Sequence, residues 1–241
     1  MSGMSRTTDT RQRVILLHAL GSSHRMFRAQ DEALSDQYDL VIPDLPGHGA
    51  APPGFSLDRA VDQVRGLIAD SGRPAHLVGV SMSATIALLV ALRDPGQVRS
   101  LLLSGATVRP SRVAVRIQRA VMAVLPIAVS ARMSARIVGP ADDRDREALV
   151  SDVAAAGKKT QAQVLRGLVG TDLTAQLRRV SVPTLVCCGQ RDTANLPAAR
   201  LISENVPGAT LRVVPGGGHL WNLEQPDECT KLIDEFVSSL A

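Results

Sequence analysis

Short apolar runs alternate with longer amphipathic segments along most of this chain. The short runs are rich in Val, Leu and Ile, and several contain consecutive apolar residues rather than a strict alternation of apolar and polar ones. That pattern is typical of strands buried on both faces of a parallel sheet. We therefore predict six strands, all buried on both faces, at residues 13–17, 38–42, 75–80, 98–105, 183–189 and 210–215.

Segments of helical length separate most of these strands. After Ser56, a residue suited to cap a helix, Leu57, Val61, Val64 and Ile68 recur at the helical period. Strands that alternate with helices predict a parallel sheet with right-handed crossovers and helices on both faces. The fold class is thus α/β, with a mainly parallel sheet of about six strands.

One interval, residues 108–180, interrupts this alternation, because it contains helical sequence and no convincing strand. An insertion of this kind between two strands is expected to cover one edge of the sheet as a helical cap. We expect one α/β core formed by residues 13–107 and 181–241. Residues 1–12 are polar and are expected to be a disordered N-terminus.

The predicted cap contains apolar stretches that we expect to cover the functional site. Met122 and Leu125 are candidates for lining a substrate pocket there. Arg112, Arg116 and Arg119 fall on one face of the first cap helix, which is most often a solvated face. The alternative is that these arginines contact an acidic group of a substrate.

Composition excludes several other classes of protein. The net charge of +4 is mild and scattered, and no basic tract interleaved with aromatic residues indicates a nucleic-acid partner. The polar start resembles neither a secretory signal nor a membrane anchor, so a cytoplasmic protein with no membrane partner is expected. Aromatic residues are only 2%, so a ligand pocket must have mainly aliphatic walls. The three cysteines lack metal-ligand or disulfide spacing and are interpreted as packing residues: Cys187, Cys188 and Cys229.

Ser81 stands at the junction between the strand at 75–80 and the following apolar helix. Catalytic groups of open α/β sheets gather at the carboxyl ends of the strands. A serine at such a corner is often only a helix cap, but Gly79 and Ser83, two residues to either side, are small enough for a strained nucleophile turn. The same turn directs the backbone NH of Met82, at the helix start, toward developing negative charge.

Five motifs in order, each at a strand end, resemble those of the α/β-hydrolase superfamily. They are VILLHALGSS (14–23), PDLPGHG (43–49), GVSMS (79–83), VPTLVCCGQRD (182–192) and VPGGGHLWNLEQP (214–226). Together they cover nearly the whole chain. Within the superfamily, the first and third motifs are most similar to small bacterial esterases and enol-lactonases.

The resemblance implies a Ser-His-Asp triad made of Ser81, His219 and Asp192. Asp192 follows the strand at 183–189 and could otherwise be a turn residue, while His219 follows the last strand after three glycines. A serine hydroxyl needs such a base, and the base needs a group that orients it. By resemblance, the backbone NH groups of Leu20 and Met82 form the oxyanion hole.

The sequence departs from the family pattern at two turns, and the usual antiparallel opening strands are not apparent. Ala19 and Ser83 stand where the family commonly has glycine. Serine at the second position is also similar to the plant strigolactone and karrikin receptors. Of the other histidines, His24 could line the pocket, and structural roles are expected for His18, His48 and His76.

The function implied is that of a cofactor-free serine hydrolase that cleaves a small carboxylic ester or lactone through an acyl-enzyme. No His, Asp or Glu cluster has metal-ligand spacing, so no metal is expected. The alternative is a ligand-responsive binding protein or sensor that retains a slow hydrolase triad. The sequence fixes neither the substrate nor the oligomeric state, and the same scaffold supports perhydrolases and carbon-carbon hydrolases.

Overall fold

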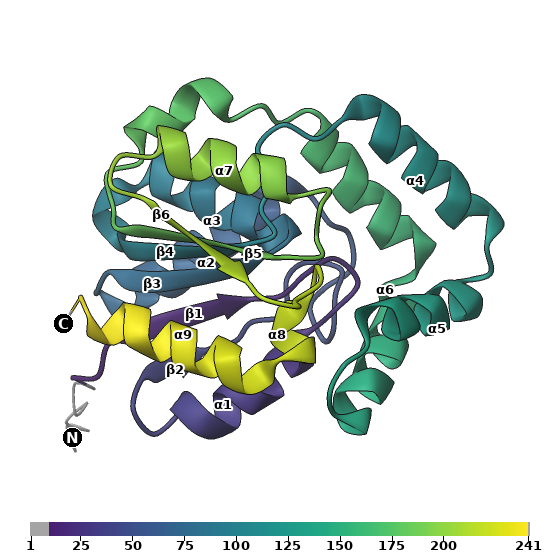
Figure 1. Ribbon diagram of the computed structural model, residues 1–241, viewed down its shortest axis with the longest axis horizontal. Coiled ribbons are helices and arrows are strands. Elements are labelled where there is room, and N and C mark those ends of the chain that lie inside the picture. The colour runs from purple at the N-terminus through teal and green to yellow at the C-terminus, as the bar shows by residue number, and fades with distance from the viewer. Residues whose placement is uncertain (1–9, 241) are drawn as a thin grey trace, which may run out of the picture.

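The computed structural model describes residues 10–240, and these form a sheet flanked by helices with a helical layer at one side (Figure 1). The predicted disordered N-terminus lies largely outside the described residues. The strands are β1 (Arg13–Leu17), β2 (Asp39–Val41), β3 (Ala75–Val80), β4 (Val98–Ser104), β5 (Thr184–Gly189) and β6 (Thr210–Val214). They pair in the order β2-β1-β3-β4-β5-β6, and every pairing is parallel. The prediction of about six mainly parallel strands is confirmed.

Helices pack on both faces of the sheet. They are α1 (Arg28–Leu34), α2 (Leu57–Ser71), α3 (Met82–Arg93), α7 (Leu196–Asn205), α8 (Trp221–Glu224) and α9 (Pro226–Ser238), with short 3-10 helices η1 (His24–Phe27), η2 (Pro95–Gln97) and η3 (Thr174–Arg179). Side chains of α2, α3 and α7 join one apolar cluster, and those of α1, α8 and α9 join the other. The two clusters lie on opposite faces of the sheet, which is therefore the central layer (Figure 1).

The prediction that all six strands are buried on both faces is wrong for β2 and β6. Every residue of β3 and β5 is buried, whereas β2 is half-buried throughout and Thr210 and Arg212 of β6 are exposed. The physical reason is position, because β2 and β6 are the two edge strands and each has a neighbour on one side only. Apolar composition alone does not distinguish an edge strand from a central one.

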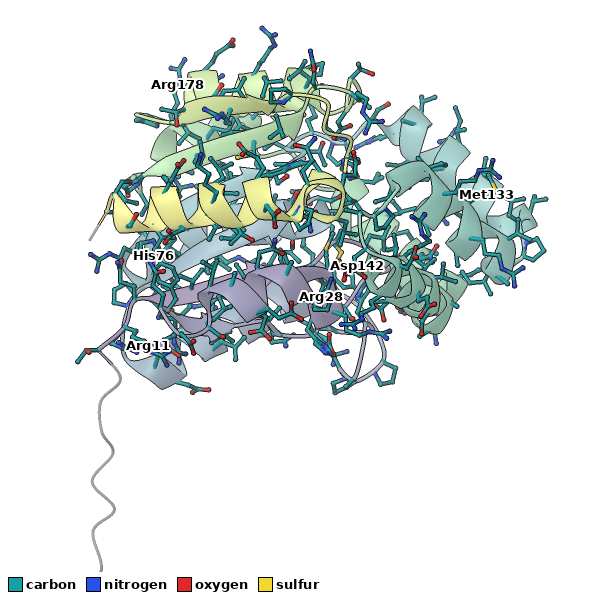
Figure 2. All side chains as sticks on the ribbon, turned by 60° about the horizontal axis from the view of Figure 1, so that its bottom comes forward. Arg11, Arg28, His76, Met133, Asp142 and Arg178 are labelled. Atoms are coloured by element: carbon teal, nitrogen blue, oxygen red, sulfur yellow. The ribbon has the colours of Figure 1, made fainter. Side chains whose placement is uncertain are left out.

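Residues 108–180 add no strand between β4 and β5. They form α4 (Arg112–Val124), α5 (Ile127–Val138), α6 (Asp143–Val169) and η3. The helix α6 is bent at Gly157, whose φ of 67° lies in the region that favours glycine. Figure 2 shows Met133 of α5 at the outer end of this group of helices, away from the sheet. Within residues 10–240, no helix is both long and apolar enough to cross a membrane.

Candidate active site

Ser81 lies at a strained corner between β3 and α3. Its φ of 60° and ψ of −116° are unusual for a residue with a side chain, and Ser81 is the one such residue with positive φ among those described. Its hydroxyl makes no helix-capping hydrogen bond, so the helix-cap interpretation is not supported. Gly79 allows the turn, since a Cβ there would lie 2.6 Å from the carbonyl oxygen of Ser83.

Ser83 does more than fit the turn. Its buried hydroxyl donates a 2.5 Å hydrogen bond to the carbonyl oxygen of Leu17 and accepts one of 2.9 Å from the backbone NH of Val80. The hydroxyl therefore joins the nucleophile turn to the end of β1. Sequence reasoning treated this serine as a small substitute for glycine and missed both hydrogen bonds.

The predicted triad residues come together at the carboxyl edge of the sheet. The Oγ of Ser81 lies 2.9 Å from Nε2 of His219, and Nδ1 of His219 lies 2.7 Å from Oδ2 of Asp192. Ser81 follows β3, Asp192 follows β5 and His219 follows β6. Three segments far apart in sequence thus form one continuous chain of hydrogen bonds.

Asn195 is a polar neighbour of the triad that sequence reasoning missed. Its side-chain amide donates to both carboxylate oxygens of Asp192, over 2.9 and 3.0 Å. Burial raises the pKa of the Asp192 carboxyl, but the hydrogen bonds from His219 and Asn195 outweigh it and hold that pKa below its usual value. The carboxylate therefore stays ionised beside His219. The sequence holds one signal for this contact, because Asn195 follows Asp192 by three residues in the same turn.

The loop that carries His219 is held from several sides. The backbone NH of Gly218 donates to the Glu224 carboxylate over 3.0 Å, and the indole NH of Trp221 donates to the Ser104 hydroxyl over 2.7 Å. Gly105 lies under the imidazole, since a Cβ there would be 3.0 Å from Cε1 of His219. Buried contacts thus fix the loop on both sides of the histidine.

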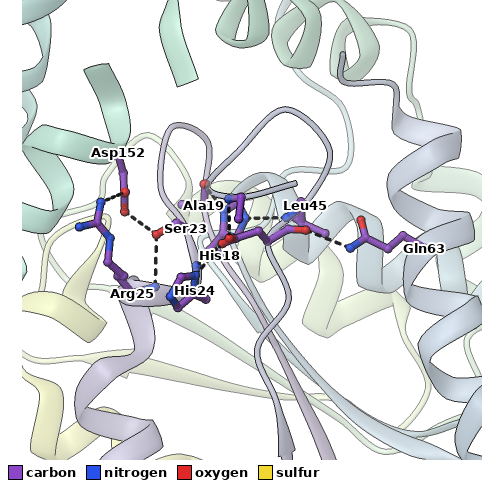
Figure 3. Close-up of polar contacts among 10 residues, drawn as sticks. His18, Ala19, Ser23, His24, Arg25, Leu45, Gln63 and Asp152 are labelled. Carbon is purple, nitrogen blue, oxygen red and sulfur yellow. Dashed lines mark hydrogen bonds and ion pairs between the residues drawn. The ribbon is translucent and has the colours of Figure 1, made fainter. Parts of the chain in front are cut away.

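His18 has the structural role predicted for it. Its Nδ1 lies 2.9 Å from the carbonyl oxygen of Ala19, and its Nε2 accepts a 3.0 Å hydrogen bond from the NH of Leu45 (Figure 3). These partners require a neutral ring protonated on Nδ1. Burial, helped by the neighbouring His48, lowers the pKa of His18 to about 3. A neutral imidazole therefore connects the loop after β1 to the loop after β2.

The cap holds the far end of the loop after β1. The buried hydroxyl of Ser23 donates to the Asp152 carboxylate of α6 over 2.6 Å, and Arg25 forms an ion pair with the same carboxylate (Figure 3). Arg28 similarly pairs with Asp145 of α6. The segment that contains Leu20 is therefore held between His18 on one side and the cap on the other.

Leu20 and Met82, the predicted oxyanion donors, both line a cavity that contains Ser81 and His219. Met82 is the first residue of α3, where the backbone NH groups carry partial positive charge. Leu20 belongs to the loop held by His18. Both residues therefore lie at the cavity that contains Ser81, and their role as oxyanion donors stays a prediction.

Two cavities meet at Ser81. One of about 620 Å³ extends toward α7 and includes Ala198, and the other of about 280 Å³ extends toward α5 and includes Met122. Gln118 of α4 lines both, which sequence reasoning missed. Of the two cap residues expected to line the pocket, Met122 does so and Leu125 does not.

The remaining candidates lie away from the triad. His24 contacts Asp44 and lines a separate cavity of about 750 Å³ that contains no triad residue. His76 lies 2.8 Å from the hydroxyl of Ser100 through Nδ1, within the sheet. The three cysteines are buried and free. Within residues 10–240, no three His, Cys, Asp or Glu side chains form a group that could hold a metal ion.

Nearly the whole chain is similar to known proteins. Residues 14–232 match the model of the alpha/beta hydrolase family. A pimeloyl-[acyl-carrier protein] methyl ester esterase of Xanthomonas axonopodis pv. citri is 29% identical, covering 94% of this chain and 95% of that protein. The 3-oxoadipate enol-lactonase 2 of Acinetobacter baylyi is 26% identical, covering 94% and 89%. A solved hydrolase from Pseudomonas aeruginosa superposes with a TM-score of 0.83 at 25% identity, covering 94% of this chain and 90% of that one.

Proposed function

The chain belongs to the alpha/beta hydrolase family, and we propose that it is a carboxylic ester hydrolase that cleaves a small ester or lactone through an acyl-enzyme on Ser81. The observation that carries the proposal is the chain of hydrogen bonds from Ser81 through His219 to Asp192. The relatives named as esterases and enol-lactonases support hydrolysis of a carboxylic ester bond.

Acylation begins when Oγ of Ser81 attacks the carbonyl carbon of the ester. Nε2 of His219, 2.9 Å from that oxygen, takes the hydroxyl proton as the new C–O bond forms. The carbonyl π electrons move to oxygen, and the NH groups of Leu20 and Met82 stabilise the resulting oxyanion. The intermediate then collapses, the C–O bond to the alcohol breaks, and His219 returns the proton to the leaving oxygen.

Deacylation repeats these steps with water as the nucleophile. His219 takes a proton from water, the water oxygen attacks the acyl carbon, and collapse breaks the bond to Ser81. The proton returns to Oγ, and the carboxylic acid leaves. With a lactone, the alcohol remains part of the same product, so the ring opens to a hydroxy acid.

Asp192 orients His219 and stabilises its charged form. The 2.7 Å contact to Nδ1 keeps the proton on that nitrogen, which leaves Nε2 free to accept the proton of Ser81. Asn195 holds the carboxylate in turn. The two cavities suit the acyl and alcohol portions of an ester whose carbonyl carbon lies at Ser81.

A panel of short-chain and long-chain aryl esters and lactones tests the proposal. Wild-type protein should turn over many equivalents of at least one of them, and Ser81→Ala should lose that turnover while its melting temperature stays close to wild type. Ser203→Ala, which changes a half-buried serine of α7 that bonds only to its own helix, is the matched control. One equivalent of product with a ligand-induced rise in melting temperature would instead indicate a sensor that retains a slow triad.

A further inference from the structure

The helices α4 and α5 expose large apolar side chains to solvent. All seven exposed large apolar residues among those described belong to these two helices. Val124 of α4 is 82% exposed and Ile137 of α5 is 76% exposed. Scattered single residues of this kind are ordinary on a protein surface, whereas a concentration on two adjoining helices is typical of an interaction surface.

The apolar residues follow the period of each helix. Val113, Ile117, Val121 and Val124 recur along α4, and Val129, Met133 and Ile137 recur along α5. We call these seven residues the apolar cap face. Another side of α4 faces inward. It contains Val115, which is buried, and Met122, and both residues line the cavities at Ser81. On α4 the apolar cap face is therefore separate from the side that packs inward, whereas Ile137 of α5 is exposed and also lines the smaller cavity at Ser81.

The same two helices carry only positive charge. No Asp or Glu occurs between Asp94 and Asp142, and the helices contain five arginines: Arg112, Arg116, Arg119, Arg132 and Arg136. Within residues 10–240, none of these five guanidinium groups forms an ion pair, in contrast to Arg28, Arg65 and Arg73. Their charges remain available to an anionic partner.

A cavity between α4 and α6 adds to this charge pattern. It has a volume of about 560 Å³, and its lining includes Arg116, Arg119 and Lys158 together with the apolar Met122 and Leu165. No acidic residue lines it. Cationic side chains around an apolar floor suit a ligand with an anionic head and a hydrocarbon portion.

We propose that α4 and α5 bind the surface of an anionic lipid bilayer, with the apolar cap face in the interfacial region and the five arginines against the lipid headgroups. A helix with an aliphatic row beside arginines lies in a membrane interface without crossing it. Anionic headgroups add attraction for each nearby arginine. This binding mode departs from the sequence expectation of no membrane partner, which considered membrane-spanning and anchoring segments.

Charge favours this occupant over a second copy of the chain. A symmetric dimer through the apolar cap face would bring two sets of five unpaired arginines together, and like charges at an interface oppose association. A bilayer with anionic headgroups has the complementary charge. A bilayer is fluid, so it can also contact the apolar rows of two separate helices without a complementary protein surface.

Docking on a bilayer would also bring the catalytic cavities close to lipid. Ala114 and Gln118 of α4 line the cavity that contains Ser81. Acyl esters that partition into the bilayer would then reach this cavity directly. That consequence for substrate choice depends on the proposed hydrolase function, whereas the binding itself does not.

Vesicle co-sedimentation tests the proposal, with phosphatidylcholine vesicles and with vesicles in which phosphatidylglycerol replaces part of the phosphatidylcholine. We expect binding to the anionic vesicles at least tenfold tighter than to the zwitterionic ones, and weaker as salt rises. Val113→Gln with Ile117→Gln, and separately Arg112→Glu with Arg116→Glu, should each weaken binding more than tenfold. Arg178→Glu with Arg179→Glu on η3 should leave it unchanged, because Arg178 lies far from α5 (Figure 2) and η3 carries none of the apolar cap face.

Several outcomes would overturn the proposal. Wild-type protein that binds both kinds of vesicle equally, or neither, would overturn it. So would a loss of vesicle binding in the η3 control as large as the loss in the α4 variants. Self-association in sedimentation velocity that Val113→Gln with Ile117→Gln abolishes, without vesicle binding, would identify a dimer interface instead. Melting temperatures show whether each variant folds. Ser81→Ala should bind vesicles like wild type, which separates failure of this proposal from failure of the proposed function.

Discussion

The hydroxyl of Ser83 donates a hydrogen bond of 2.5 Å to the carbonyl oxygen of Leu17, which joins the nucleophile turn to the end of β1. His18 and Leu20 follow Leu17 closely in sequence, so this contact helps to hold the turn and the proposed oxyanion loop relative to each other. The NH of Met82 lies in the turn and the NH of Leu20 lies in the loop. The Ser83 hydroxyl thus adds to the pairing of β1 with β3 in holding the segments of the two proposed donors together.

Ser83→Ala should lower both stability and activity. The substitution leaves the buried groups that Ser83 contacts without their hydroxyl partner, which typically costs about 1–3 kcal/mol in the free energy of unfolding. We expect kcat to fall as well, because the oxyanion loop loses its link to the turn. Urea unfolding and ester hydrolysis measure the two effects, and Ser203→Ala should change neither. Wild-type stability in Ser83→Ala would show that the contact contributes nothing.

Asn195→Ala should reduce kcat by about tenfold to a hundredfold, which corresponds to losing a hydrogen bond to a charged group worth about 1.5–3 kcal/mol. The amide of Asn195 helps to hold the pKa of Asp192 below its usual value, so its removal should raise that pKa. Titration of the Asp192 carboxyl by NMR checks this, with Asn205→Ala at the end of α7 as control. An unchanged Asp192 pKa together with wild-type kcat would reduce Asn195 to a packing role.

Acid should destabilise the fold through His18. Its pKa is about 3 in the folded protein, against 6.5 for an unperturbed histidine. As pH falls below about 6.5, the unfolded chain binds a proton that the folded chain does not, so stability present above that pH is lost at about 1.4 kcal/mol per pH unit until about pH 3. Burial also lowers the pKa of His48 and His76, which add to the wild-type slope, so urea unfolding from pH 8 to pH 5 of wild type and of His18→Asn measures the share of His18. His18→Asn should be less stable at neutral pH but show a shallower slope, and an unchanged slope would contradict the assignment.

The two cavities at Ser81 should select different halves of the substrate. Met122→Trp reduces the smaller cavity and Ala198→Trp the larger one. Each should slow hydrolysis of long substrates by at least about tenfold, since one methylene group in an apolar pocket is worth about 1–3 kcal/mol. Two ester series should be compared, one that varies the acyl chain and one that varies the alcohol. One variant should slow hydrolysis mainly in the first series and the other variant mainly in the second. Val113→Trp, on the exposed side of α4, is the control. If both variants affect the same series, the two cavities bind one group.

Features of the fold that depend on local pattern could be predicted from the sequence. Central strands such as β3, which is buried at every position, are recognisable because they are mainly apolar, and Ser56 caps α2 through the NH of Arg59 as expected. Edge exposure in β6 could not be predicted in this way, because it depends on strand order. Strand order is set by contacts between distant segments, which a one-dimensional pattern does not contain.

The candidate site likewise has features that the local sequence predicts and features that depend on contacts between distant segments. The contact of Ser81 and Asp192 with His219 was predictable because each residue follows a strand, and parallel strands bring their carboxyl ends to one edge. The roles of Ser83 and Asp152 were not, because their partners Leu17 and Ser23 are remote in sequence. Exposure of the apolar cap face was also unpredictable, since an amphipathic pattern does not say which neighbour covers it.

Covalent labelling at Ser81 tests the central claim most directly. Wild-type protein treated with a fluorophosphonate should gain the mass of one phosphonyl group per chain, mapped by peptide mass spectrometry to Ser81, and should lose ester hydrolysis in the same proportion. Ser81→Ala should gain no mass under the same conditions. Full hydrolysis by the fully labelled protein, or undiminished hydrolysis by Ser81→Ala, would contradict an acyl-enzyme on this serine.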